Sequence, residues 1–165
     1  MSPEPRPFAE AEDGIVLPAA AFRGLMEDIL GRRESVRFRA GGCSMHPFIR
    51  DGDVLTVSPF AGRGPKLGDV VAFRRSGDDR LLVHRIVAGA PGCFVTRGDA
   101  ALEPDGPIAA GLLLGRVTRV ERGVHEVRLG RRPERLLLAA LSRHGLLTPL
   151  VAAGRKLEAA WRRLR

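Results

Sequence analysis

Several residue types on which common functional sites depend are scarce in this sequence. There is no tyrosine and a single tryptophan among 165 residues, so few aromatic rings are available for stacking on nucleic-acid bases. The two cysteines, Cys43 and Cys93, are too few for a disulfide framework, and no Cys-x-x-Cys pair accompanies the four histidines. A zinc site is therefore not expected, and no motif points to another metal or to a cofactor.

Long apolar runs are also absent from the sequence. No run of about 18 uncharged apolar residues occurs in it, although an ordinary membrane-spanning helix needs a run of about that length. Residues 1–14 read MSPEPRPFAEAEDG, which lacks the basic start and the apolar centre of a secretory signal. We therefore expect a cytoplasmic location, and we expect residues 1–16 to form a disordered leader.

Positive charge is concentrated at one end of the chain. Residues 131–165 contain nine basic and two acidic side chains, so they account for +7 of the formal net charge of +8, and residues 1–130 are close to neutral. This distribution is not that of a nucleic-acid-binding surface, and no nucleic-acid partner is expected. Two interpretations of residues 131–165 stay open: an amphipathic helix packed on the folded body, or a peripheral contact with the inner surface of a membrane.

Hydrophobic periodicity predicts a mainly β domain between helical segments. Apolar residues follow helical spacing over Leu17–Arg33. From Ser35 to Leu129, short apolar runs alternate with Gly, Pro and Asp turns, and no segment there is long enough for a crossover helix. We expect a small coiled antiparallel barrel or sandwich. The predicted strands are Val36–Ala40, Val54–Ser58, Val70–Arg74, Leu81–Ala88, Cys93–Arg97, Leu113–Val120 and Val124–Leu129.

Helical spacing returns after Gly130, which suggests a division of the chain. One apolar stripe is formed by Leu136, Leu137, Ala140 and Leu141, and a second helical stretch is expected over Val151–Leu164. Residues 17–130 are thus predicted to form one domain with a leading helix. Residues 131–165 are predicted to form a basic amphipathic helical tail.

Three segments of the predicted β domain carry side chains with reactive chemistry. Ser44 lies in the small-residue loop 41–53, where a substrate can approach the backbone and an N–H group can face a developing oxyanion. His84 interrupts an apolar strand, and strand alternation places it on the apolar face. Asp99 and Asp105 lie in a loop rich in Gly and Pro. Each segment also has an ordinary interpretation: a tight turn, a hydrogen-bonded core histidine, or a solvated turn.

Together these segments provide a Ser, a His and an Asp on a β scaffold, and five motifs occur in an order that resembles one known family. The resemblance is to the type I signal peptidases and the related LexA-like self-cleaving repressors, and it covers roughly residues 35–122. The motifs are Gly42-Cys43-Ser44-Met45-His46-Pro47, Gly68-Asp69-Val70-Val71-Ala72-Phe73, His84-Arg85-Ile86-Val87, Thr96-Arg97-Gly98-Asp99 and Leu114-Gly115-Arg116-Val117.

The resemblance implies a serine endopeptidase that cleaves precursor or signal-like peptides, with residues 17–130 as its catalytic domain. Bacterial members have a Lys where this chain has His84, so the chain looks most like the archaeal and endoplasmic-reticulum branch. By that resemblance Ser44 is the nucleophile and His84 the general base. The supporting acid falls on Asp105, and Asp99 matches a second acidic residue near the site.

The chain departs from the family pattern around its nucleophile. Gly42 and Cys43 occupy positions where the family commonly has Ser-Gly, so a side-chain donor to the oxyanion is missing. We expect Gly42, Cys43 and Met45 to contact substrate, with core packing as the alternative for Met45. A catalytically inactive peptide-binding or regulatory member of the same fold stays open as an alternative, as does self-cleavage. The family's membrane anchor is also missing, so the substrate is expected to be a cytoplasmic or membrane-proximal precursor, or a partner protein supplies the anchor.

Overall fold

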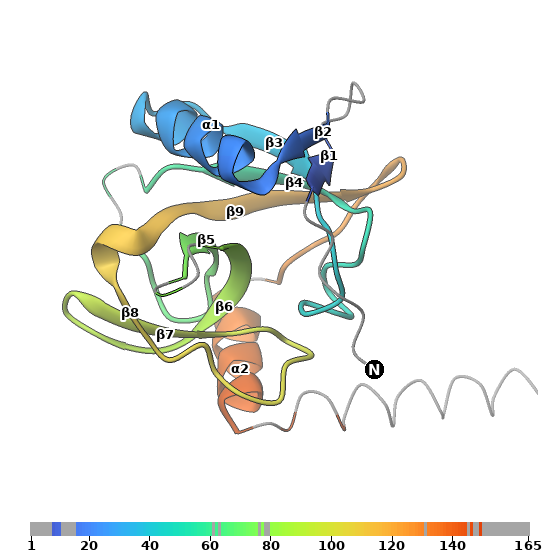
Figure 1. The fold of residues 1–165 in the computed structure, drawn as a ribbon. Coiled ribbons are helices and arrows are strands. Elements are labelled where there is room, and N and C mark those ends of the chain that lie inside the picture. The colour runs from blue at the N-terminus through green and yellow to red at the C-terminus, as the bar shows by residue number, and fades with distance from the viewer. Residues whose placement is uncertain are drawn as a thin grey trace, which may run out of the picture.

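One antiparallel sheet, with a helix on either side, organises the structure (Figure 1). This computed structural model describes residues 8–10, 16–60, 62, 64–75, 77, 80–130, 132–144, 146 and 149. The helices are α1 (Ala19–Gly31), the short 3-10 turn η1 (Ala110–Leu112) and α2 (Arg132–Arg143). The strands are β1 (Phe8–Glu10), β2 (Val16–Pro18), β3 (Val36–Arg39), β4 (Val54–Ser58), β5 (Val70–Arg74), β6 (Leu81–Ala90), β7 (Cys93–Arg97), β8 (Pro107–Ala109), β9 (Leu113–Arg122) and β10 (His125–Glu126).

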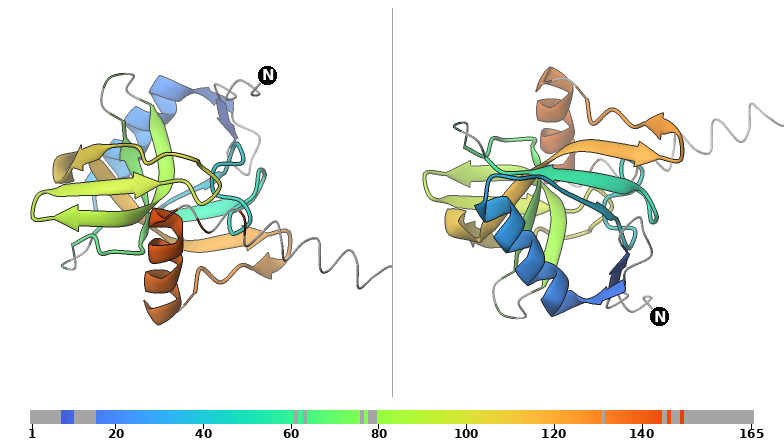
Figure 2. Two further views of the ribbon diagram at one scale, coloured as in Figure 1. Left: turned by 90° about the horizontal axis from the view of Figure 1, so that it is seen from below. Right: turned by 90° about the horizontal axis from the view of Figure 1, so that it is seen from above.

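The sheet follows the order β3-β4-β9-β5-β6-β7-β8, with β10 paired to β9, and all of its described pairs are antiparallel. The predicted mainly β, antiparallel class is therefore confirmed. Irregular register in the β4–β9, β5–β9 and β6–β7 pairs bends the strands, and the sheet coils around the core (Figure 2).

The small coiled barrel or sandwich expected from the sequence is not confirmed, because the sheet formed by the described strands is not closed. The sheet is a single open one, because β3 and β8 stand at its two edges and do not pair with each other within the described residues. These edge strands have four and three residues, which leaves little backbone for a closing ladder.

Strand boundaries agree with the sequence prediction at β4, β5 and β7, and differ by two residues or fewer at the ends of β3, β6 and β9. The predicted strand Val124–Leu129 is wrong except for the two residues of β10, because Val124 is exposed in the turn that precedes it. Strand β8 was not expected, and it begins with Pro107, a residue that edge strands tolerate.

The disordered leader is also corrected for the part of it that is described. Residues 8–10 form β1, which pairs antiparallel with β2. The segment therefore contains a short hairpin ahead of α1 where only a leader was expected. Other residues of the leader lie outside the described ranges.

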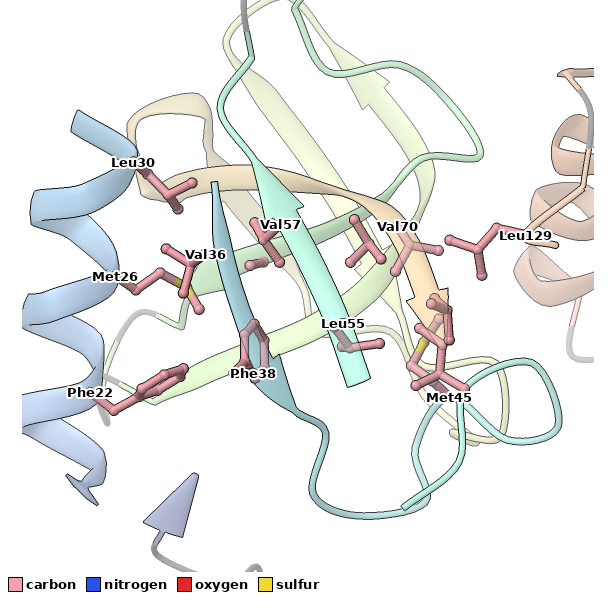
Figure 3. Close-up of a cluster of buried hydrophobic side chains, with 14 residues drawn as sticks. Phe22, Met26, Leu30, Val36, Phe38, Met45, Leu55, Val57, Val70 and Leu129 are labelled. Atoms are coloured by element: carbon pink, nitrogen blue, oxygen red, sulfur yellow. The ribbon is translucent and has the colours of Figure 1, made fainter. Parts of the chain in front are cut away.

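The main hydrophobic core lies between α1 and the sheet (Figure 3). Phe22, Met26 and Leu30 recur every fourth residue, so one face of α1 is buried. Phe22 packs edge-on against Phe38 of β3, with 5.1 Å between ring centroids. This packing fixes α1 against the sheet edge that leads into the loop carrying Ser44.

Helix α2 packs against β6 on the other side of the sheet from α1 (Figure 1). Ala139 and Ser142 are buried, whereas Leu137 is largely exposed. Residues 132–143 therefore form a helix that packs on the folded body, which was the first of the two interpretations of this segment. The predicted second helical stretch, Val151–Leu164, lies outside the described residues. No helix in the described part of the chain is long and apolar enough to cross a membrane.

An ion pair between the buried Asp53 and the partly exposed Arg122 closes the base of the Ser44 loop. Asp53, which is 2 % exposed, accepts hydrogen bonds from Nε and Nη2 of Arg122 at 2.8 and 2.7 Å and from the Arg50 N–H at 2.8 Å. Burial alone raises the pKa of the Asp53 carboxyl, but the hydrogen bonds and charge of Arg122 and the Arg50 N–H together hold that pKa below its ordinary value. Arg122 also donates to the Phe48 carbonyl at 3.2 Å, so it ties β9 to the loop.

The lowered pKa of Asp53 makes part of the stability pH-dependent. The folded pKa lies below the unfolded value of about 3.9, so the Asp53 carboxylate stabilises the fold above that pH and loses this effect as the pH falls through the folded pKa. We predict that Asp53→Asn lowers the free energy of unfolding by about 1–3 kcal/mol at pH 7. Urea unfolding at pH 7, 5, 4 and 3 should show this difference from wild type shrinking at the acidic end.

Asp28→Asn is the matched control for Asp53→Asn, because Asp28 is exposed on α1. Its effect should stay within about 0.5 kcal/mol at every pH. A difference between wild type and Asp53→Asn that does not change between pH 7 and pH 3 would contradict the assignment.

Candidate active site

The loop between β3 and β4 presents Ser44 at the surface. Its base is closed by Ala40 N–H to the Asp53 carbonyl at 2.7 Å and Gly52 N–H to the Ala40 carbonyl at 2.9 Å. Gly42 has φ +91°, which disfavours other residues, and its N–H donates to Oδ1 of Asp51 at 2.8 Å. These bonds turn the chain so that Ser44 is exposed while Met45, next to it, is buried.

His84 connects Ser44 to Asp105. Its Nε2 lies 2.9 Å from Oγ of Ser44, and its Nδ1 lies 2.7 Å from Oδ2 of Asp105. His84 is 6 % exposed and its ring lies 6.0 Å from that of Phe73 on β5, centroid to centroid. His84 therefore points to the apolar face, as predicted. It is also a buried, hydrogen-bonded histidine, which was the ordinary interpretation of this residue. A Ser, a His and an Asp thus form one continuous chain of hydrogen bonds.

The surroundings of Asp105 determine the tautomer of His84. Oδ2 of Asp105 also accepts a hydrogen bond from the Thr96 hydroxyl at 2.8 Å, and the Asp105 N–H donates to the Thr96 carbonyl at 2.9 Å. A carboxylate oxygen that already accepts from Thr96 also accepts from Nδ1–H of a neutral imidazole. In that tautomer Nε2 carries a lone pair and accepts the Ser44 hydroxyl proton, which is the arrangement that a general base requires.

The loop between β7 and β8 supplies the third part of the site, and Figure 1 shows it on the same side of the sheet as the Ser44 loop. Ala100 N–H donates to the Ser44 carbonyl at 2.8 Å. A Cβ atom at Gly98 would lie 2.6 Å from the Ser44 carbonyl oxygen and 3.1 Å from Nε2 of His84. The two loops can therefore meet only because position 98 has no side chain.

Asp99 does not belong to the chain of hydrogen bonds that runs through His84. Its Oδ1 and Oδ2 accept from Nε and Nη2 of Arg85 at 2.8 and 2.7 Å, and both side chains are fully buried. Arg85 also donates to the Gly68 carbonyl at 3.1 Å and lies over the Phe48 ring at 5.6 Å. Asp99 therefore does not take the part in the chemistry that was predicted from the sequence. Its pairing with Arg85 instead joins the loops that contain Asp99, Gly68 and Phe48.

The residues expected to contact substrate separate into two groups. Met45 is 4 % exposed and lies in the main core, so core packing is what the structure shows for it (Figure 3). Gly42 and Cys43 are exposed beside Ser44, and Cys43 is a free thiol. The Ser44 N–H is hydrogen-bonded to no other described residue, which leaves it available to an incoming oxygen atom.

Sequence reasoning missed the hydrogen bond of Thr96 to Asp105 and the pairing of Arg85 with Asp99. A signal for both was present, because Thr96 ends the strand before the Gly-Asp motif, and an Arg within an apolar strand requires a buried acid. No group of three or more His, Cys, Asp or Glu side chains within the described ranges is arranged to hold a metal ion. A cavity of about 250 Å³ lies apart from Ser44, between β9, β10 and the start of α2.

Comparisons with protein-family models, with curated proteins and with solved structures gave no match for this chain. The chemistry of the site is therefore inferred from its own geometry and from the order of its motifs.

The close approach at Gly98 leads to a stability prediction. Gly98→Ala places a methyl group against the Ser44 carbonyl oxygen, so the free energy of unfolding should fall by about 1–3 kcal/mol and the two loops should separate. Gly41→Ala is the matched control in the Ser44 loop, because a Cβ there meets no atom within 4 Å. Thermal or urea unfolding of both variants measures the effect, and equal stabilities would contradict it.

Proposed function

We propose that this chain is a serine endopeptidase of the signal-peptidase-like superfamily, with Ser44 as nucleophile and His84 as general base. The observation that carries the proposal is the continuous chain of hydrogen bonds from Ser44 through His84 to Asp105, with distances of 2.9 and 2.7 Å. The three residues come from β6 and two loops far apart in the sequence. Such a set suits acyl transfer on any fold that brings it together.

The proposed reaction follows from which atoms carry protons. Oγ of Ser44 attacks the carbonyl carbon of a peptide bond while Nε2 of His84 takes the hydroxyl proton. The imidazolium, stabilised by Asp105, then gives that proton to the nitrogen of the leaving amine as the C–N bond breaks. Water attacks the acyl-enzyme, and His84 takes a proton from the water and returns one to Oγ of Ser44. Asp105 stays ionised throughout.

The oxyanion of the tetrahedral intermediate needs hydrogen-bond donors near Ser44. Ser44 is exposed, and its N–H has no hydrogen-bond partner among the described residues, which supports a role for this backbone donor. Cys43, in the preceding position, supplies no strong side-chain donor. Transition-state stabilisation is therefore assigned to backbone N–H groups.

The proposed substrate is a precursor or signal-like peptide, and this part of the proposal rests on the order of the five motifs. A cytoplasmic location and a peripheral membrane contact through residues 131–165 belong to the same proposal, as does a partner protein that supplies an anchor. The +7 charge of that segment supports attraction to anionic headgroups.

Ser44→Ala and a fluorophosphonate probe test the proposed nucleophile. The probe should label wild-type protein on Ser44, as located by peptide mass spectrometry, and should fail to label Ser44→Ala. Ser35→Ala is the matched control, because Ser35 is exposed and lies outside the site, and it should be labelled like wild type. Unaltered labelling of Ser44→Ala would refute the proposal.

The dependence of labelling on His84 and Asp105 separates a peptidase from an inactive peptide-binding member. His84→Gln removes the base, and Asp105→Asn favours the wrong tautomer, so each should slow labelling by about 10²- to 10⁴-fold. Labelling of Ser44 at the wild-type rate in His84→Gln would instead favour the inactive member. The intact mass of purified protein over time, at several pH values, tests self-cleavage in the same preparation.

A further inference from the structure

Arg97 is a buried cation at the point where the Asp105 loop meets the C-terminal helix. It is 7 % exposed, and its Nε and Nη2 donate to the Ala101 carbonyl at 3.1 and 2.9 Å. Nη2 also donates to the Leu102 carbonyl at 2.6 Å, and Nη1 makes a longer contact of 3.4 Å with the Arg143 carbonyl. One planar guanidinium group thus connects Ala101 and Leu102, in the loop between β7 and β8, to Arg143, the last residue of α2.

The charge of Arg97 is compensated by carbonyl groups. Within the described residues Arg97 has no carboxylate partner, and all of its hydrogen bonds end on backbone carbonyl oxygens. The carbonyls at the C-terminal end of a helix carry partial negative charge that favours a nearby cation. The Arg143 carbonyl is at that end of α2, so the docked helix stabilises the buried charge.

The loop whose carbonyls Arg97 holds makes three contacts with the candidate site. Ala100 N–H holds the Ser44 carbonyl, Gly98 packs against both Ser44 and His84, and Asp105 accepts from His84. Ala101 and Leu102, whose carbonyls Arg97 holds, lie between Ala100 and Asp105 in the sequence. We expect a shift of Ala101 and Leu102 to be passed along the loop to Ala100 and Asp105, and so to change their positions relative to Ser44 and His84.

Helix α2 is seated firmly at its other end. A Cβ at Gly68 would lie 2.7 Å from the Arg135 carbonyl oxygen, so helix and turn are in direct backbone contact. Nη1 of Arg135 lies 3.6 Å from Oδ1 of Asp69. The Gly68 carbonyl in turn accepts from Arg85, the residue after His84. Contacts at both ends of α2 thus lead to the loops around His84.

We infer that Arg97 is a positioning residue that makes the Ser44–His84–Asp105 geometry depend on the docking of α2. This inference rests on the proposed peptidase function for its catalytic consequence, whereas its structural part stands on the contacts alone. Arg97 touches none of the reacting atoms and acts through the Asp105 loop. The helix that it engages lies outside residues 35–122, which carry the motif resemblance, so α2 is a part of the site that the motifs do not contain.

Matched substitutions of two arginines test the role of Arg97. Arg97→Met keeps the apolar stem and removes the donors, so Ser44 labelling by the fluorophosphonate probe should slow by about 10- to 100-fold. Arg97→Lys keeps the charge without the planar fork and should give an intermediate rate. Arg143→Met removes an exposed side chain but keeps the carbonyl that Arg97 contacts, and it should label like wild type.

A second pair of substitutions tests the docking of α2 directly. Ala139 is fully buried, so Ala139→Asp should displace the helix, whereas Ala140→Asp changes the exposed residue beside it. If α2 acts through Arg97, the effect of Ala139→Asp and that of Arg97→Met are not additive in the double variant. Multiplied rate losses in the double variant would overturn the inference, because the helix and Arg97 would then act separately.

An NMR readout distinguishes failure of this inference from failure of the proposed function. In ¹⁵N-labelled protein, the Nδ1–H proton of His84 that is bonded to Asp105 gives a ¹H–¹⁵N signal, assigned by its loss in His84→Gln. We expect folded Arg97→Met and Ala139→Asp to lose or shift this signal, and Arg143→Met and Ala140→Asp to keep it. An unchanged signal in the first pair overturns the inference even if the probe labels no variant. If Arg97→Met does not fold, Arg97→Lys and the Ala139 and Ala140 variants decide by the same signal.

Discussion

The loop between β7 and β8 reaches the Ser44 loop through a gap that only glycine can occupy. At Gly98 the backbone lies against the Ser44 carbonyl and the edge of the His84 ring, and a Cβ would come within 2.6 Å of that carbonyl oxygen. Because this approach is possible, Ala100 can hold Ser44 from one side while Asp105 holds His84 from the other. The chemistry proposed for Ser44 therefore depends on this contact between two backbones as well as on the hydrogen bond of His84 to Asp105.

Two ion pairs hold the surrounding loops, one of them fully buried and the other with a partly exposed arginine. Asp53 with Arg122 closes the Ser44 loop, and Arg85 with Asp99 joins the turn at Gly68 to the loop at Gly98. Breaking the fully buried pair of Arg85 and Asp99 would leave an uncompensated charge, which disfavours other arrangements of the two loops that it joins. This use of charge fits the near neutrality of residues 1–130, where basic and acidic side chains are present in almost equal number.

Much of the fold was predictable from the sequence because strand patterns are local. Three strands have the predicted bounds, and alternation placed His84 on the apolar face where it is found. The motif order also brought Ser44, His84 and Asp105 together as a candidate set. The sequence did not predict that Asp99 pairs with Arg85 while Asp105 bonds His84, because this depends on which carboxylate faces Arg85 from a neighbouring segment of the fold. The open sheet and the role of Arg97 depend on long-range packing that no local pattern encodes.

The position of β9 in the sheet has a consequence for how the chain acquires its site. β9 pairs with both β4 and β5, so it lies between the strand that follows Ser44 and the β5–β6 pair, whose second strand carries His84. These pairings join segments far apart in the sequence, and such contacts form slowly. During synthesis, residues 113–122 emerge after Ser44, His84 and Asp105 have all been made. Ser44, His84 and Asp105 are therefore all present in the nascent chain before the strand that joins β4 to β5, and their alignment forms only after β9 has been added to the sheet.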